Sequence, residues 1–203
     1  MTATLPALRS EEAKRRQLTL TKRRATVLLG VGRADAYQFE GGRWPTRTIT
    51  YFTDTAAYRW SVDTAAYAWN TSGARVQFVK TSRADAQVLV GIRWYKQPAG
   101  EAHVQRLGDA FVSATVGVQA GHDRYEMALI VAHELGHVLG LDHETRQCAT
   151  MNPSVGADHT TLCAAPQNGM WTCRLLQPDD VRGAVALYGG TVRAWRGPTF
   201  CPR

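Results

Sequence analysis

The segment HELGHVLGLDH, residues 133–143, constrains this chain more than any other part of its sequence. On an α-helix, residues four apart lie above one another, so His133 and His137 present two imidazole nitrogens to one point beside the helix. Glu134 lies on the adjacent face, where its carboxylate reaches a water on a bound metal ion but is badly placed to be a third ligand. The spacing predicts a helix with a two-histidine metal clamp and a carboxylate for proton transfer.

A third histidine completes the ligand set only if this helix ends soon after His137. On a continuous helix, His143 would be rotated by roughly 240° from His137. Gly140 can adopt a positive φ and turn the chain back toward the metal. Three neutral histidines leave a fourth position for water, which is typical of catalytic zinc, whereas structural zinc usually has four protein ligands. We therefore predict one catalytic Zn²⁺ ion held by His133, His137 and His143.

Glu134 is the predicted catalytic residue of this site. A zinc ion lowers the pKa of its water from about 15.7 toward about 7 and polarises a neighbouring carbonyl. As general base, Glu134 takes the proton of the water and carries it to the leaving nitrogen of a peptide bond. The alternative is a helix whose histidines merely face solvent or core. Apolar residues at helical spacing favour a buried helix that supports the site; they are Met127, Ile130, Val131, Leu135 and Val138.

HELGHVLGLDH resembles the extended zinc motif of the metzincin metallopeptidases, and two further segments are similar to the matrixin branch of that clan. Met151, in the sequence CATMNP, looks like the methionine turn that lies beneath the zinc. Its distance from His143 and the Pro153 that follows fit the matrixins. The segment LLQPDDVRGAVALYG, from Leu175 to Gly189, is similar to the matrixin C-terminal helix. The resemblance covers most of the chain from about Trp44 to Gly189.

This resemblance implies a metzincin-like catalytic domain of the α+β class. A mixed, twisted β-sheet and two long helices would lie above the zinc site, with the methionine turn and the C-terminal helix below it. The chain's own patterns predict strands at 47–54, 74–82 and 86–94 and a helix at 61–70, in the order βαββ. We place 109–119 at the sheet edge above the zinc, where an extended peptide can add as a further strand. An edge strand that binds nothing is the alternative.

Some residues depart from the matrixin pattern. Glu144 follows the third zinc histidine, where matrixins usually have serine and astacins have glutamate, but the astacin tyrosine after the methionine turn is absent. No good copy of the matrixin segment for a second, structural zinc and for calcium is found. Its loose candidates are His103, Asp109, His122 and Asp123, which are more typical of surface loops. We expect one zinc ion, find no support for calcium, and expect a divergent member, bacterial by its excess of arginine over lysine.

The formal net charge of +7 is concentrated at the N-terminus. Residues 1–36 carry a net charge of +5 and residues 37–203 only +2, so the charge gives no argument for a nucleic-acid partner. In the leader, KRRATVLLGVGRADA has twin arginines, a short apolar run and an Ala-x-Ala triplet, as in an export signal. A disordered basic tail or propeptide remnant fits equally well. We predict a leader at 1–36 and a catalytic domain at 37–203, without a membrane span.

All four cysteines lie in the C-terminal third of the chain. An even number in irregular sequence predicts two disulfides in a secreted protein, and free thiols are the alternative. Of the three possible connectivities we favour Cys148–Cys163, which would pin the loop under the zinc, and Cys173–Cys201, which would tie the tail to the last helix.

The sequence thus favours a secreted, monomeric zinc endopeptidase that acts on protein or peptide substrates and binds neither nucleic acid nor membrane. The rival hypothesis is a metal-binding module that keeps the fold and lacks catalysis, and the presence of Glu134 argues against it. A third hypothesis, nucleic-acid binding through the leader, is disfavoured by the charge distribution. Side-chain preference is expected from a pocket formed by the zinc helix and residues 152–155, next to the loop at 156–171.

Overall fold

The computed structural model describes residues 37–93, 98–153 and 175–193, all of which belong to one compact unit at 35–203. Its main sheet has the five strands β2 (Thr48–Thr53), β3 (Gln77–Lys80), β4 (Val88–Arg93), β5 (Gly100–Leu107) and β6 (Ala110–Gln119). Their order is β3-β2-β4-β6-β5. Neighbouring strands are parallel except for β5 and β6, which form an antiparallel hairpin. The predicted mixed sheet is confirmed.

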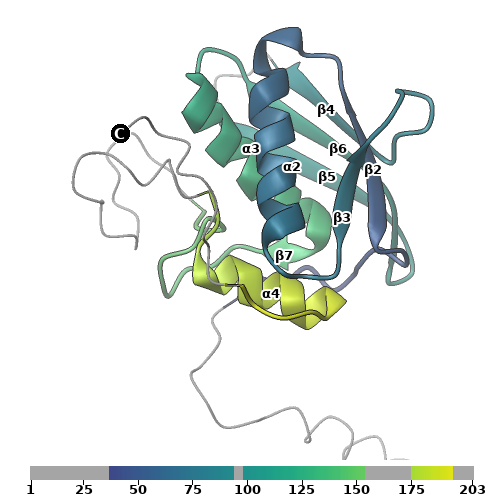
Figure 1. Cartoon of the computed structure of the whole chain (residues 1–203), viewed down its shortest axis with the longest axis vertical. Coiled ribbons are helices and arrows are strands. Elements are labelled where there is room, and N and C mark those ends of the chain that lie inside the picture. The colour runs from purple at the N-terminus through teal and green to yellow at the C-terminus, as the bar shows by residue number, and fades with distance from the viewer. Residues whose placement is uncertain (1–36, 94–97, 154–174, 194–203) are drawn as a thin grey trace, which may run out of the picture. The chain divides into compact units, whose positions relative to one another are not determined.

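Among the described residues, three α-helices and a one-turn 3₁₀ helix, η1 (Ala56–Tyr58), accompany the sheet. The helices α2 (Arg59–Thr71) and α3 (Arg124–Leu139) lie side by side on one face of the sheet, and α4 (Pro178–Tyr188) lies near the end of α3 (Figure 1). A two-stranded antiparallel ribbon joins β1 (Gln38–Phe39) to β7 (Leu141–Asp142). The predicted α+β class, with two long helices on the sheet and a C-terminal helix below, is confirmed. None of the described helices has the length and apolar character to span a membrane.

Buried tryptophans and a tyrosine fix α3 in place. Trp69 of α2 donates from Nε1 to the carbonyl of Ala132 in the middle of α3, at 2.9 Å. At the C-terminal end of α3, Trp44 donates to the carbonyl of Val138 at 2.7 Å, and the Tyr188 hydroxyl donates to that of Leu139 at 2.8 Å. The last carbonyls of a helix have no partner within the helix, so these side chains satisfy groups that would otherwise be buried unpaired. The end of α3 is therefore fixed from two other parts of the chain.

The β-strand and helix predictions are confirmed in position, with one error in the sheet order. The predicted strands at 47–54, 74–82 and 86–94 contain β2, β3 and β4, and the helix predicted at 61–70 is α2, which begins two residues earlier. The segment 109–119 is a strand, but it lies between β4 and β5 and is not the sheet edge. The edge strand next to the zinc helix α3 is β5, and β3 forms the other edge. The sequence did not reveal β5 because its residues GEAHVQRL are mostly polar or small.

Several predictions concern residues outside the described ones. These are the leader at 1–36, the loop at 156–171, and the cysteines Cys163, Cys173 and Cys201. The predicted pocket wall at 152–155 is described only for Asn152 and Pro153.

Candidate metal centre

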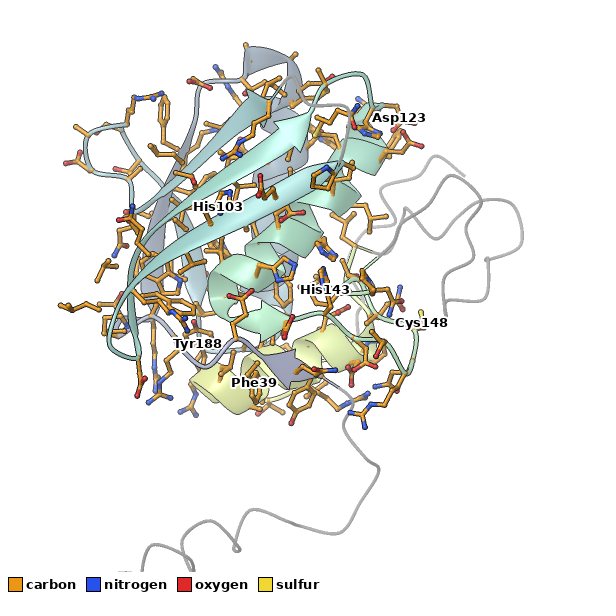
Figure 2. All side chains as sticks on the ribbon, turned by 180° about the vertical axis from the view of Figure 1, so that it is seen from behind. Phe39, His103, Asp123, His143, Cys148 and Tyr188 are labelled. Carbon is orange, nitrogen blue, oxygen red and sulfur yellow. The ribbon has the colours of Figure 1, made fainter. Side chains whose placement is uncertain are left out.

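The three histidines of HELGHVLGLDH converge on one point. The helix α3 carries His133 and His137 one turn apart, and it ends at Gly140, which has a φ of 98°. The left-handed conformation at Gly140 turns the chain into β7, and His143 follows this strand directly. One ring nitrogen from each histidine lies within 4.8 Å of the others, and the three are the only such group among the residues that the structure describes. Figure 2 shows His143 between the end of α3 and α4.

Hydrogen bonds at Nδ1 orient the two helical histidines. His133 donates from Nδ1 to the carbonyl of Thr150 at 2.7 Å. His137 donates from Nδ1 to the carbonyl of Leu141 at 2.9 Å and to Oε1 of Glu40 at 3.0 Å. These partners are acceptors only, so the proton of each neutral ring is on Nδ1 and a lone pair is on Nε2.

The donor set fits a zinc ion. The Nε2 atoms of His133 and His137 face each other at 3.1 Å, and two lone pairs at this distance repel unless a proton or a metal cation lies between them. Neutral imidazoles that each donate their other N–H to a carbonyl or carboxylate are the usual zinc ligands. Burial lowers the pKa of His133 to about 3, helped by the charge of His137, so this ring is neutral over the physiological range.

The other two histidines differ in their electrostatics. For His137, burial lowers the pKa, but the Glu40 hydrogen bond and the nearby carboxylates outweigh this effect and leave the pKa raised. For His143, burial and the charge of His137 lower the pKa. His137 is therefore the ring at which a proton competes most strongly with a metal ion.

Glu134 lies beside the histidines and is almost fully buried, with 4% of its surface exposed. Burial raises its pKa to about 7, against the lowering effect of the His137 charge and with a smaller raising effect from Glu101. The first residue of β5, Gly100, packs directly against it, because a Cβ there would lie 2.4 Å from Glu134 Oε1. The structure thus brings together the residues predicted for the site and places the edge strand next to the predicted base.

Met151 packs beneath α3, where the sequence predicted a methionine turn. A Cβ on Gly136 would lie 2.2 Å from the Met151 sulfur, so the glycine of HELGH leaves the space that this side chain fills. The turn is tied to α4 by Asp180, whose carboxylate accepts the backbone N–H groups of Thr150 and Met151 at 2.9 and 3.1 Å. Burial raises the pKa of Asp180 to about 6, although these N–H groups act in the opposite direction.

Glu144 and Asn152 hold the loop between the third histidine and the turn. The Glu144 carboxylate accepts the backbone N–H groups of Arg146 and Gln147, and its own N–H donates to the carbonyl of Met151 at 2.8 Å. Asn152 donates from Nδ2 to the carbonyls of Glu144 and Gln147 at 2.7 and 2.9 Å. Glu144, which departs from the matrixin pattern, is only 1% exposed. Its role in the described structure is to hold the loop through these hydrogen bonds.

The sequence contains no indication of Glu40 or of the contact of Asp180 with the turn, and it predicted Asn152 as part of a pocket wall and not as a residue that holds the loop. Asp179 and Asp180 stand in the first turn of α4, where acidic residues are common for reasons unrelated to a functional site. No signal in the sequence points to Glu40, which lies 97 residues from its partner His137.

The loose candidates for a second metal have ordinary roles in the described structure. His103 pairs with Glu101 on β5 at 2.9 Å, and His122 lies 3.4 Å from Glu126. Asp123 is the N-cap of α3, and the carbonyl of Asp109 accepts the N–H of Arg43.

Comparison with known proteins agrees with this geometry. The model of the matrixin family matches residues 43–189. The macrophage metalloelastase of Oryctolagus cuniculus is 41% identical over 63 residues, which are 30% of this chain and 11% of that protein. The neutrophil collagenase of Homo sapiens is 33% identical over 82 residues, which are 40% of this chain and 15% of that protein. The matched segments are thus short parts of these relatives. The family match, however, covers most of the chain, and this protein belongs to the matrixin family.

Proposed function

We propose that this chain is a secreted zinc-dependent endopeptidase that hydrolyses peptide bonds with Glu134 as general base. The observation that carries the proposal is the convergence of His133, His137 and His143 beside a buried carboxylate. The matrixin family match and the names of two similar proteins, a metalloelastase and a collagenase, support a protein substrate. The proposal includes one zinc ion on the three histidines, with Met151 packed beneath the site as a structural residue.

The residues of the site have distinct tasks. When bound, zinc supplies Lewis-acid chemistry, because it lowers the pKa of water and polarises a carbonyl. The Nδ1 hydrogen bonds of His133 and His137 hold the two rings with Nε2 toward the ion. Glu134 accepts the proton of the attacking water and returns it to the leaving nitrogen. A base is most effective when its pKa is near the working pH. Burial raises the pKa of Glu134 to about 7 in the metal-free protein, and the charge of a bound zinc ion would lower it from there.

The edge strand β5 is the proposed binding site for the substrate backbone, in place of the segment 109–119. Within the described part of the chain, β5 pairs with β6 alone, so its other edge offers N–H and C=O groups to an extended peptide. The strand begins at Gly100, next to Glu134, which would bring a peptide on this edge close to the base. Such backbone pairing favours extended chains and has little sequence preference of its own.

Secretion, the domain division and the disulfides belong to the same proposal. Cys148 is the one cysteine among the described residues, and it is not a free thiol. This supports a disulfide at Cys148 next to the methionine turn, as expected for an exported protein, and Cys163 is its proposed partner. We further propose that residues 1–36 are a leader and 37–203 the catalytic domain, which acts as a monomer without nucleic-acid or membrane partners.

The test is cleavage of casein by the purified protein, both as the full chain and without residues 1–36, with and without a zinc chelator. The expected result is chelator-sensitive cleavage that zinc restores. Glu134→Ala is expected to lower kcat by at least about 100-fold while zinc remains bound, because general-base catalysis contributes factors of about 10² to 10⁴.

Two outcomes would contradict the proposal. If the purified protein binds no zinc, the proposed metal site is wrong. A protein that binds zinc but cleaves no peptide in either form supports the rival hypothesis of a non-catalytic metal-binding module.

A further inference from the structure

Glu40 is held beside the candidate metal centre by its backbone. It follows β1 directly, and the β1–β7 ribbon continues through a bond from its N–H to the carbonyl of Gly140 at 3.0 Å. Its own carbonyl accepts Nη1 of Arg106, from β5, at 3.0 Å. Both backbone groups of Glu40 are therefore fixed, one to the end of the zinc helix and one to the edge strand.

The Glu40 side chain points to the back of a predicted zinc ligand. Its Oε1 lies 3.0 Å from Nδ1 of His137, the nitrogen opposite to the one that faces the other histidines. The His137 side chain is 12% exposed and that of Glu40 is 32% exposed, so the ring is largely shielded from water and the carboxylate is partly shielded. Exposed ion pairs contribute little, but a shielded carboxylate acts strongly on the ring it contacts.

The two helical histidines differ in this respect. His133 donates from Nδ1 to a neutral carbonyl, that of Thr150, whereas His137 donates to a neutral carbonyl and to a carboxylate. A carboxylate behind a histidine fixes the ring with its proton on Nδ1 and makes Nε2 a stronger electron donor to a metal.

We propose that Glu40 is a positioning residue for His137, which orients the ring and strengthens it as a zinc ligand. The inference rests on the zinc site proposed above and adds a charged group from the N-terminal ribbon to it. It also gives the ribbon a function, because β1 and β7 bring a residue 97 positions away in sequence to the back of the ligand.

Three variants of the full chain test this inference. Glu40→Gln keeps an oxygen acceptor and removes the charge, and Glu40→Ala removes both. Glu126→Gln is the matched control, because Glu126 contacts the Nδ1 of His122, which is not one of the three converging histidines. The zinc dissociation constant is measured by competition with a chromophoric chelator. The Co²⁺ absorption spectrum and the unfolding midpoint of the metal-free protein are recorded beside it.

The expected results are graded. Loss of a partner behind a metal ligand typically weakens metal binding by about 10- to 100-fold, so Glu40→Gln is expected near the lower value and Glu40→Ala near the upper one. The Co²⁺ bands should shift in both variants, while Glu126→Gln binds zinc as the wild type does. The unfolding midpoint of the metal-free Glu40→Gln protein should stay at the wild-type value, because the hydrogen bond is kept.

Each contrary outcome has its own meaning. Failure of the wild type to bind zinc contradicts the proposed function itself. Wild-type zinc affinity in Glu40→Ala overturns the inference alone, since the Leu141 carbonyl would then suffice to orient His137. A second pattern would also overturn the inference. In it, Glu40→Ala weakens zinc binding and lowers the unfolding midpoint of the metal-free protein, whereas Glu40→Gln binds zinc as the wild type does. Glu40 would then have a purely structural role.

Discussion

The candidate site has two halves that are held in different ways. One half is α3, which carries His133, His137 and Glu134 on a single helix with regular backbone hydrogen bonds. The other half is the loop 141–153, which carries His143 and Met151 and has only the two residues of β7 in regular structure. Buried side chains replace the missing backbone ladder in this loop: Asp180, Asn152 and Glu144.

The difference shows where the geometry of the site is vulnerable. In the helix, each hydrogen bond is one of many, and loss of a single one changes the position of the ligands little. In the loop, one carboxylate or one amide accounts for two or three hydrogen bonds, so a single substitution removes several of them. The helix half is expected to respond to changes in charge, and the loop half to changes in hydrogen bonding.

The largest expected effect lies in the helix half and depends on pH. In the metal-free protein, burial raises the pKa of Glu134 to about 7, so the folded state retains a proton that the unfolded chain releases near 4.5. The stability from this proton is fully present below pH 4.5 and is lost as the pH rises through about 7. Between about pH 4 and about pH 8, the free energy of unfolding should fall by about 3 kcal/mol relative to Glu134→Gln. Urea unfolding of both metal-free proteins at several pH values measures this difference.

Parallel pH curves for the wild type and Glu134→Gln would contradict this prediction. They would mean that water reaches the carboxylate and that burial does not govern its titration.

Asp180→Ala is the strongest test of the loop half. It leaves three backbone N–H groups, those of Thr150, Met151 and Gln177, without their acceptor. A buried donor without a partner costs about 1 to 3 kcal/mol, and part of this cost is relieved by relaxation, so we expect a loss of about 2 to 3 kcal/mol. The thermal midpoint should fall by roughly 8 °C in a chain of this size. An unchanged midpoint would show that α4 does not hold the methionine turn.

The sequence predicted the helix half of the site almost completely, because its geometry is local. The spacing of His133, Glu134 and His137 determines their positions on one helix, and Gly140 ends that helix where the third histidine requires it. A spacing of this kind needs no knowledge of the rest of the chain.

The loop half and the sheet order could not be predicted in the same way, because they depend on contacts between distant residues. Asp180 lies 30 residues from Thr150, and Glu40 lies 97 residues from His137. From the sequence, the apolar segment that forms β6 is expected at the edge, and the polar residues of β5 show no strand pattern. Hydrophobicity indicates how deeply a strand is buried, and the buried β6 is indeed interior, but it does not identify the neighbours of a strand.

Asn152→Ala tests whether the loop affects the metal centre. The change removes donors to the carbonyls of Glu144 and Gln147 and an acceptor for the N–H of Ala149. We expect a loss of about 1 to 2 kcal/mol in the free energy of unfolding and weaker zinc binding, because Glu144 directly follows His143.

The matched control for Asn152→Ala is Asn70→Ala. Asn70 makes the same kind of contact, from α2 to both backbone groups of Phe78 at 2.9 and 2.7 Å, but away from the three histidines. Both variants should lose similar stability, and only Asn152→Ala should weaken zinc binding, as measured by chelator competition. Equal zinc affinities in the two variants would contradict this prediction. They would show that the Asn152 hydrogen bonds stabilise the loop without affecting the geometry of the zinc ligands.

Asp123→Ala has the smallest expected effect and tests whether the helix half is independent of its own end. Asp123 caps α3 by accepting the N–H groups of Tyr125 and Glu126 at 2.7 and 2.9 Å, in an exposed position. Loss of such a cap costs about 1 kcal/mol, and Asp123→Ser should restore most of it. Zinc affinity and kcat should not change, because His133 lies more than two turns from the cap and Trp69 fixes the helix at Ala132. A fall in zinc affinity, measured by the same competition assay, would show that fraying at the start of α3 reaches the ligands. The helix would then depend on single side chains as much as the loop does.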